Sequence, residues 1–138
     1  MSDGNQQSRS AFTEKQTTAL ERTLLRANAN SGLIFRVYVG PLDVGRASAL
    51  AIHRDLPSPD LSVLIAVDPG SRAIEIVTGV LAKEQVEDQS CRLASLTMAS
   101  RFAIGDIAAG LRDGANVLAE HARALRVLHT NEPEGASS

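Results

Sequence analysis

The sequence predicts an α/β domain in which helices flank a small mixed sheet. Three short runs are rich in β-branched, aromatic and aliphatic residues, at 33–39, 61–67 and 73–78. Between and around them, apolar residues recur at helical spacing in four further segments. The resulting order is helix, strand, helix, strand, strand, helix, helix. This order favours a parallel strand–helix–strand unit, then a hairpin, then two long C-terminal helices.

The first helix is predicted to begin after Thr13, because Thr13 and Gln16 have the spacing of a capping box. Apolar residues then follow at helical spacing from Leu20 to Ala27, and an Asn/Ser/Gly-rich stretch ends the helix. The sequence LIFRVYV predicts the first strand, residues 33–39, which a Gly-Pro pair ends.

The middle of the chain predicts a short helix and a hairpin. Asp43 is expected to cap the short helix, which a Pro-rich segment ends. The run at 61–67 is almost entirely apolar, which indicates a central strand buried on both faces. The sequence DPGS after it predicts a type II turn with a positive φ at Gly70, leading into an outer strand at 73–78.

Two long helices are predicted at the C-terminal end. The first is expected from Ala82 to Phe102, and the second begins after its cap, Asp106. Gly110 and Gly114, one turn apart, predict that the second helix lies close to a neighbour. This helix carries one apolar stripe, formed by Ile107, Leu111, Ala115, Leu118, Ala122 and Leu125.

Length and composition predict the domain organisation and disfavour several classes of function. The 138 residues predict one folded domain at 11–128, with disordered polar tails at 1–10 and 129–138. A net charge of −2, no Lys/Arg block, and only one Tyr and three Phe disfavour nucleic-acid binding. The apolar runs are too short for a membrane span. The N-terminus lacks a signal-peptide pattern, so we expect a cytoplasmic location.

Carboxylates are predicted to gather at one rim of the sheet. Asp43 and Asp68 follow the two parallel strands, and Asp106 begins the last helix at the same end. Open α/β sheets bind ligands outside the carboxyl ends of their parallel strands, and carboxylates suit Ca²⁺ or Mg²⁺. These three Asp residues are therefore candidate metal ligands. Each of them also fits a purely local role in a turn or helix cap.

Three segments in this order resemble the TPM domain family: ALERTLLRANANSGLIFRVYVGPL, LSVLIAVDPGSRAIEIVTG and EDQSCRLASLTMASRFAIGDIAAGL. The chain is most similar to a short actinobacterial branch of this family, a branch of unknown function. The most specific parts are the Asp-x-x-x-Arg hairpin of Asp68 and Arg72, Gly79 after the third strand, and the stretch from Phe102 to Leu111.

The resemblance implies a three-layer α/β/α sandwich. It also implies acid phosphatase activity and divalent-metal binding in some members, and scaffold roles in membrane-protein assembly or repair in others. Family members typically carry an Asp shortly before the first helix, whereas SRSAFTEKQ has none at this place. Many relatives also have a signal peptide and a membrane helix, which this sequence does not show.

One hypothesis is a weak, divalent-metal-dependent acid phosphatase acting on phosphomonoesters. Asp43, Asp68 and Asp106 would hold the ion, and Arg46 or Arg72 would contact the phosphate. The sequence contains no nucleophile elbow, phosphate-cradling loop or Cys/His metal spacing. It therefore identifies no catalytic nucleophile, and we expect no organic cofactor.

The other hypothesis is a non-enzymatic TPM-like module that binds a protein partner, which the sequence does not identify, or holds a divalent metal in a structural role. It predicts an exposed apolar or small-residue patch, for which Gly110 and Gly114 are the candidates. The missing N-terminal Asp and the lack of a nucleophile motif favour this second hypothesis.

Three further residues have ambiguous patterns. Arg36 and Glu75 interrupt the first and third strands, where they would either pair across a shared face or lie on a solvated surface. Cys91 falls on a predicted helix among apolar residues and is expected to act as a small apolar side chain.

Overall fold

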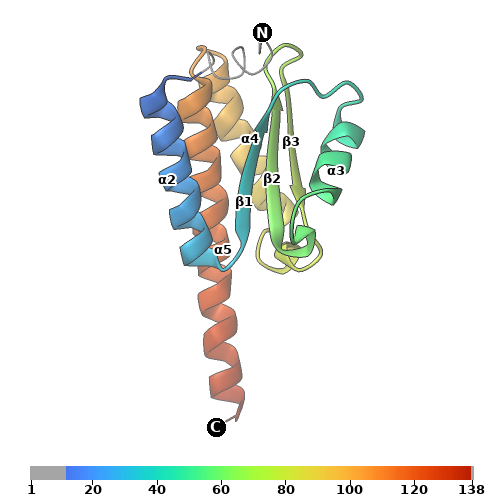
Figure 1. Ribbon diagram of the computed structural model, residues 1–138. Coiled ribbons are helices and arrows are strands. Elements are labelled where there is room, and N and C mark those ends of the chain that lie inside the picture. Colours follow the sequence, from blue (N-terminus) through green and yellow to red (C-terminus); the bar gives the residue numbers. More distant parts are fainter. Residues whose placement is uncertain (1–11, 138) are drawn as a thin grey trace.

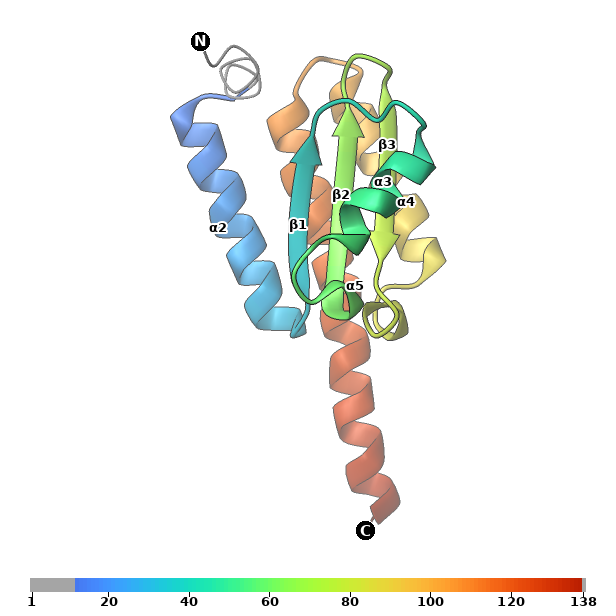
Figure 2. The same cartoon turned by 45° about the vertical axis from the view of Figure 1, so that its right-hand side comes forward.

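Helices cover both faces of a three-stranded mixed sheet (Figures 1 and 2). The computed structural model describes the backbone of residues 12–137 and the side chains of residues 12–122. The predicted order of helices and strands is confirmed. The elements are α2 (Glu14–Ser31), β1 (Ile34–Val39), α3 (Arg46–Arg54), η1 (Pro59–Leu61), β2 (Ser62–Asp68), β3 (Ala73–Thr78), η2 (Ala82–Glu84), α4 (Asp88–Phe102) and α5 (Ile107–Ser137).

The sheet has the order β1-β2-β3. Strands β1 and β2 are parallel, with α3 between them in the chain, and Ile34 pairs with Ser62. Strand β3 runs antiparallel to β2, with Asp68 opposite Ala73. Strands β1 and β2 therefore end at the same edge, the top rim, where α2 and α5 begin (Figure 1). This confirms the predicted α/β topology.

The two faces of the sheet belong to two separate cores. The smaller core lies under α3 and contains Leu64, Ala66 and Val77. The larger core lies between the other face and helices α2, α4 and α5. Residues of β2 from Ser62 to Val67 are all buried, as expected for a strand covered on both faces. These layers are the predicted three-layer α/β/α sandwich.

Helix α2 begins as its sequence predicts. The Thr13 Oγ1 atom accepts a hydrogen bond from the Gln16 N–H at 3.0 Å, and the Gln16 Oε1 atom accepts one from the Thr13 N–H at 2.9 Å. This reciprocal pair is a capping box, and it satisfies two amide groups at the helix start. The helix ends at Gly32, whose φ of 77° is left-handed.

Helices α4 and α5 lie close together because glycines remove side chains from their interface. A Cβ atom added at Gly114 would lie 2.6 Å from the Cγ atom of Met98, and one added at Gly110 would collide with the ring of Phe102. The predicted close approach is confirmed. Both glycines are buried, so the exposed patch expected beside them was a wrong prediction.

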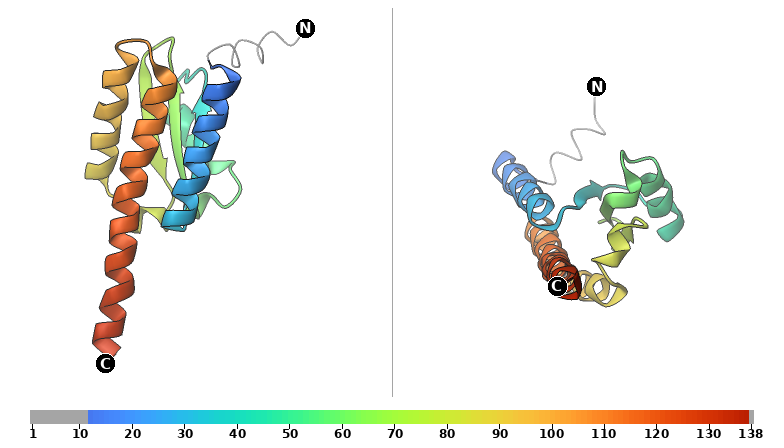
Figure 3. Two further views of the ribbon diagram at one scale, coloured as in Figure 1. Left: turned by 90° about the vertical axis from the view of Figure 1, so that its left-hand side faces the viewer. Right: turned by 90° about the horizontal axis from the view of Figure 1, so that it is seen from below.

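The C-terminal part of α5 differs from the sequence-based expectation. Its backbone continues as helix to Ser137 and extends beyond the sheet (Figure 3). The stretch 129–137, predicted to be a disordered tail, is therefore helical. The side chain of Leu125, which was assigned to the apolar stripe, lies outside the described side chains, and the predicted tail at 1–10 lies outside the described residues.

Two helix starts also differ. Gly45, with a φ of 57°, is the N-cap of α3 and makes no side-chain cap, so Asp43 does not cap this helix. The third predicted helix is two elements, because Glu87 is extended (ψ 162°) between η2 and α4. Helix α4 thus begins at Asp88 instead of near Ala82.

Candidate functional site

Asp68 connects two loops of the top rim. Its Oδ2 atom accepts a hydrogen bond from the Leu42 N–H at 2.9 Å. Its Oδ1 atom accepts from the N–H groups of Gly70 at 3.1 Å and Ser71 at 3.4 Å. The Leu42 hydrogen bond is the main cause of a lowered Asp68 pKa, because it stabilises the charged carboxylate. Asp68 therefore fastens the loop after β1 to the β2–β3 turn.

The β2–β3 turn differs from the predicted type II turn. The residue with a left-handed backbone is Arg72, with a φ of 60°, and Gly70 has no positive φ. The Gly70 and Ser71 amides donate hydrogen bonds to the Asp68 carboxylate at the start of the loop. The chain then reverses direction at Arg72, the last residue of the loop. A left-handed conformation costs an L-residue about 1–2 kcal/mol.

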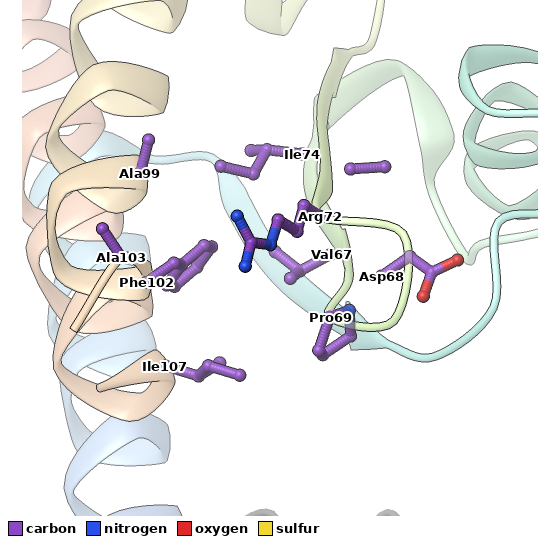
Figure 4. Close-up of a pocket in the computed structure, with 10 residues that line it drawn as sticks. Val67, Asp68, Pro69, Arg72, Ile74, Ala99, Phe102, Ala103 and Ile107 are labelled. Atoms are coloured by element: carbon purple, nitrogen blue, oxygen red, sulfur yellow. The ribbon is translucent and has the colours of Figure 1, made fainter. Parts of the chain in front are cut away.

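The three predicted metal ligands do not form a cluster. Asp106 caps α5, because its Oδ1 atom accepts a hydrogen bond from the Ala109 N–H at 3.2 Å. Asp43 is exposed, and the carboxylate of Asp68 points away from α5 (Figure 4). Within the described side chains, no three His, Cys, Asp or Glu residues lie close enough together to hold a metal ion. Each of the two bonded carboxylates serves its own local backbone instead.

Arg46, predicted to contact phosphate, is already engaged. Its Nη1 atom lies 3.1 Å from Glu75 Oε1 and donates a hydrogen bond to the carbonyl of Ile76 at 3.3 Å. Glu75 therefore pairs with Arg46 and not with Arg36, which corrects one of the alternatives left open by the sequence. The Nε atom of Arg36 is buried, and no described residue accepts a hydrogen bond from it.

Arg72 lies at an apolar hollow of about 440 Å³ between the β2–β3 hairpin and the junction of α4 and α5. Figure 4 shows its guanidinium pointing toward Phe102, whereas the Asp68 side chain points the other way. We call this hollow the Arg72 pocket. Its lining includes Val67, Arg72, Ile74, Ala99, Phe102 and Ile107.

A second hollow of about 570 Å³ continues from the Arg72 pocket along β3. The two share Arg72, Ile74 and Ala99, so together they form one groove between β3 and α4, the β3–α4 groove. Its further walls are Arg46, Ile76, Cys91, Arg92 and Leu96.

The floor of this groove is an unpaired strand edge. The Ile76 carbonyl accepts from Arg46 and therefore faces away from β2. Three residues further along, the Gly79 N–H donates to the Ser62 carbonyl on the β2 side. Backbone groups of successive residues therefore alternate between facing β2 and facing away from it. The backbone N–H and C=O groups of Ile74 and Ile76 thus face outward, while their side chains pack on the larger core, and no described residue accepts a hydrogen bond from either amide. Sheet edges of this kind can pair with another extended chain.

The groove is more basic than acidic and has an exposed apolar wall. Arg46, Arg72 and Arg92 line it, together with two carboxylates: Glu75, which is paired with Arg46, and Asp68, which accepts hydrogen bonds from backbone amides. Leu96 on α4 is 70% exposed beside these charges. Cys91 is partly buried against the larger core. Burial first, and then Asp88, raise the pKa of its thiol, so it is a protonated apolar side chain, as expected.

Fold and groove together define an α/β/α sandwich domain with an open strand edge. The chain belongs to the family described as Domain of unknown function (DUF5130), whose model matches residues 1–119. Two uncharacterized proteins of Mycobacterium tuberculosis, MT2543 and Rv2468c, are each 32% identical over 103 residues, which cover 72% of this chain. The matched region spans 60% of the length of these relatives.

A solved structure shares the fold. The NMR structure of the BA42 protein from the psychrophilic bacterium Bizionia argentinensis superposes with a TM-score of 0.70. It is 17% identical, and the match covers 83% of each chain. This likeness supports the three-layer architecture alone. The resemblance to the TPM domain family stays a prediction. In the described part of the chain, no helix is long and apolar enough to cross a membrane.

Sequence reasoning missed most of the groove. It identified Arg72 but assigned it to phosphate, and it gave no role to Ile74, Arg92 or Leu96. The signal for Arg92 and Leu96 is their spacing: they lie four residues apart on α4, off the buried stripe of Ala94 and Met98. The outward direction of the Ile74 backbone groups depends on the order of the strands in the sheet, which the spacing of apolar residues does not reveal.

Proposed function

We propose that this protein is a non-enzymatic α/β module that binds an extended segment of an acidic protein partner along the β3–α4 groove. The observation that carries the proposal is the coincidence of an unpaired strand edge with a groove beside it. Ile74 and Ile76 offer outward-facing backbone hydrogen-bonding groups, and α4 supplies the opposite wall. Strand addition to a sheet edge is a recurrent way in which proteins bind extended peptides.

The backbone would supply the affinity in this mode. The amides of Ile74 and Ile76 can each donate to a carbonyl of an incoming segment, and the Ile74 carbonyl can accept from it. The Ile76 carbonyl is engaged by Arg46, but at 3.3 Å this bond is long, and the Arg46 side chain is largely exposed. Arg46 can therefore move toward the partner when the segment pairs with β3.

Side chains would supply the selectivity. Alternate residues of an added strand would face α4, where Leu96 and the Arg72 pocket offer apolar contacts. Arg72 and Arg92 have no carboxylate partner among the described residues, and Arg46 has only Glu75. This charge balance favours a segment with acidic residues.

The phosphatase hypothesis gains less support from the geometry. It needs several carboxylates around one ion, and Asp43, Asp68 and Asp106 are not gathered within the described residues. Arg46 is paired with Glu75, and Arg72 points into an apolar pocket away from Asp68. The proposed phosphate contacts and the proposed ligands therefore face different places.

Selection of peptides from a random displayed library on the immobilised full chain tests the proposal. Enriched peptides are then titrated calorimetrically into the wild-type protein and into Ile74→Pro and Ile74→Val. Proline removes the outward amide of an edge strand and leaves the β2 ladder in place, whereas valine keeps the amide and the branched side chain.

We expect acidic, β-prone peptides that lose at least about tenfold in affinity with Ile74→Pro and less than about threefold with Ile74→Val. Spectra of amide groups establish that both variants remain folded. Enrichment of peptides whose affinity is the same in both variants, or no enrichment at all, would contradict strand addition at β3.

A further inference from the structure

We infer that the Arg72 pocket holds the C-terminal residue of the partner segment, with its carboxylate on the Arg72 guanidinium and its apolar side chain against Phe102 and Ile107. This inference rests on the proposed function, since it names the end of the segment that binds in the β3–α4 groove. The chemistry it requires is a carboxylate joined directly to an apolar group.

The guanidinium of Arg72 is placed for a ligand. Of the described arginines near the groove, Arg46 pairs with Glu75 at 3.1 Å, and Arg101 pairs with Asp113 at 2.9 Å. Arg72 has no carboxylate or carbonyl partner among the described residues, although Asp68 is only four positions away in the chain. Guanidinium groups bind carboxylates with two parallel hydrogen bonds, which gives both strength and geometry.

Most of the residues that line the pocket beside the exposed Arg72 side chain are apolar. Val67, Ile74, Phe102 and Ile107 line the pocket, whose volume of about 440 Å³ is within the range of small-ligand sites. An anion that enters it is partly removed from water, so its attraction to Arg72 is stronger than on an open surface. The apolar walls offer nothing to replace the water around a hydrated inorganic ion, so such an ion fits the pocket less well. A ligand with an apolar body and one terminal anion fits both features.

The backbone of Arg72 is a third observation. With a φ of 60° it adopts a conformation in which glycine or asparagine would be less strained. Strained non-glycine residues cluster at ligand sites, although Ser58, with a φ of 51°, adopts the same conformation elsewhere in this chain. Here the left-handed turn places the guanidinium on the α4 side of the hairpin (Figure 4).

The position of the pocket favours a chain end. Arg72 directly precedes β3, so the strand edge available for pairing stops there. A segment added to β3 would reach the Arg72 pocket with its last paired residue. If the partner segment ends at this point, its terminal carboxylate and the side chain of its last residue lie side by side, as the pocket requires. The segment would then run antiparallel to β3, with its C-terminus at the top rim.

The test uses N-acetyl-leucine as the probe, because it reproduces a C-terminal apolar residue with its preceding amide. It is titrated into the isotope-labelled full chain, beside the neutral N-acetyl-leucinamide and the simple acid 4-methylpentanoate. The amide signals of residues 67–74 and 99–107 report on the pocket. We expect saturable binding of N-acetyl-leucine there, at least about tenfold weaker binding of the neutral amide, and weaker binding of 4-methylpentanoate.

Variants identify the anchoring residue. Arg72→Gln should lower the affinity for N-acetyl-leucine at least about tenfold, whereas Arg92→Gln, at the other end of the groove, should change this affinity less than about twofold. Equal binding of the acid and its amide, or no effect of Arg72→Gln in a folded protein, would overturn the inference. Binding of 4-methylpentanoate as tight as that of N-acetyl-leucine would overturn the chain-end assignment in favour of a free small acid.

The two proposals can fail separately. Ile76→Pro, at a residue that lines the groove but not the Arg72 pocket, should weaken peptide binding at least about tenfold and leave N-acetyl-leucine binding unchanged, because the acid does not need the strand amide. Library peptides that bind along β3 with no preference for a free C-terminal carboxylate would contradict this inference and leave the proposed function standing. Binding of N-acetyl-leucine without any peptide binding would contradict the proposed function.

Discussion

Asp68 and Arg72 lie at the two ends of one turn, and the protein uses them in opposite ways. The Asp68 carboxylate accepts hydrogen bonds from three backbone amides, including that of Leu42, 26 positions away in the sequence. Arg72 makes no such contact among the described residues and points into an apolar pocket (Figure 4). A paired Asp and Arg in a sequence motif therefore need not share one site: here the carboxylate is structural, and the guanidinium is available to a ligand.

The stability of Asp68 variants should show the largest effect of this difference. Asp68→Ala leaves the amides of Leu42, Gly70 and Ser71 without their acceptor, so we expect a clear drop in the melting temperature. Asp106→Ala is the matched control, because it removes one helix cap, typically worth about 1 kcal/mol. Thermal unfolding should show the larger loss in Asp68→Ala; an equal or smaller loss would contradict the structural role of Asp68.

Arg72 variants should behave in the opposite way. Arg72→Gly relieves the left-handed backbone, so we expect its free energy of unfolding to rise by up to about 1 kcal/mol relative to Arg72→Ala. Both variants should lose N-acetyl-leucine binding, since both lack the guanidinium. Denaturant unfolding measures the difference. A glycine variant no more stable than the alanine variant would show that the arginine backbone is not strained.

The acid dependence of stability should distinguish the two residues as well. The pKa of Asp68 is lowered in the folded protein from an ordinary value of 3.8, so its stabilisation is fully present above that value. It is lost as the pH falls through the lower folded pKa. We expect the stability of Asp68→Asn to depend less on pH below about pH 4 than that of the wild type, whereas Arg72→Gln should follow the wild-type curve. Urea unfolding at several pH values measures both curves.

Local chemistry made much of the fold predictable. The capping box of Thr13 and Gln16, the buried central strand and the Gly110 and Gly114 contacts all depend on neighbouring residues or on side-chain period. The three-layer sandwich could be predicted for the same reason, since few arrangements bury one apolar strand between helices.

The candidate site could not be predicted in this way. The turn sequence DPGS favours a type II turn locally, but the Gly70 and Ser71 amides bond to the Asp68 carboxylate, and the left-handed residue is Arg72. The same bonds engage the Asp68 carboxylate within its own loop. The outward direction of Ile74 follows from sheet order, and the groove exists because α4 leaves the edge of β3 open. The Leu42 bond to Asp68, the sheet order and the open edge of β3 each depend on contacts between distant segments.

Hydrogen exchange at β3 tests the central claim most directly. In the free protein, the amides of Glu75 and Val77 face β2 and should exchange slowly, whereas those of Ile74 and Ile76 should exchange fast. At saturation with a peptide selected on the full chain, Ile74 and Ile76 should slow at least about tenfold, because new strand hydrogen bonds protect them. Unchanged exchange at both amides in the saturated complex would contradict a partner segment bound along β3.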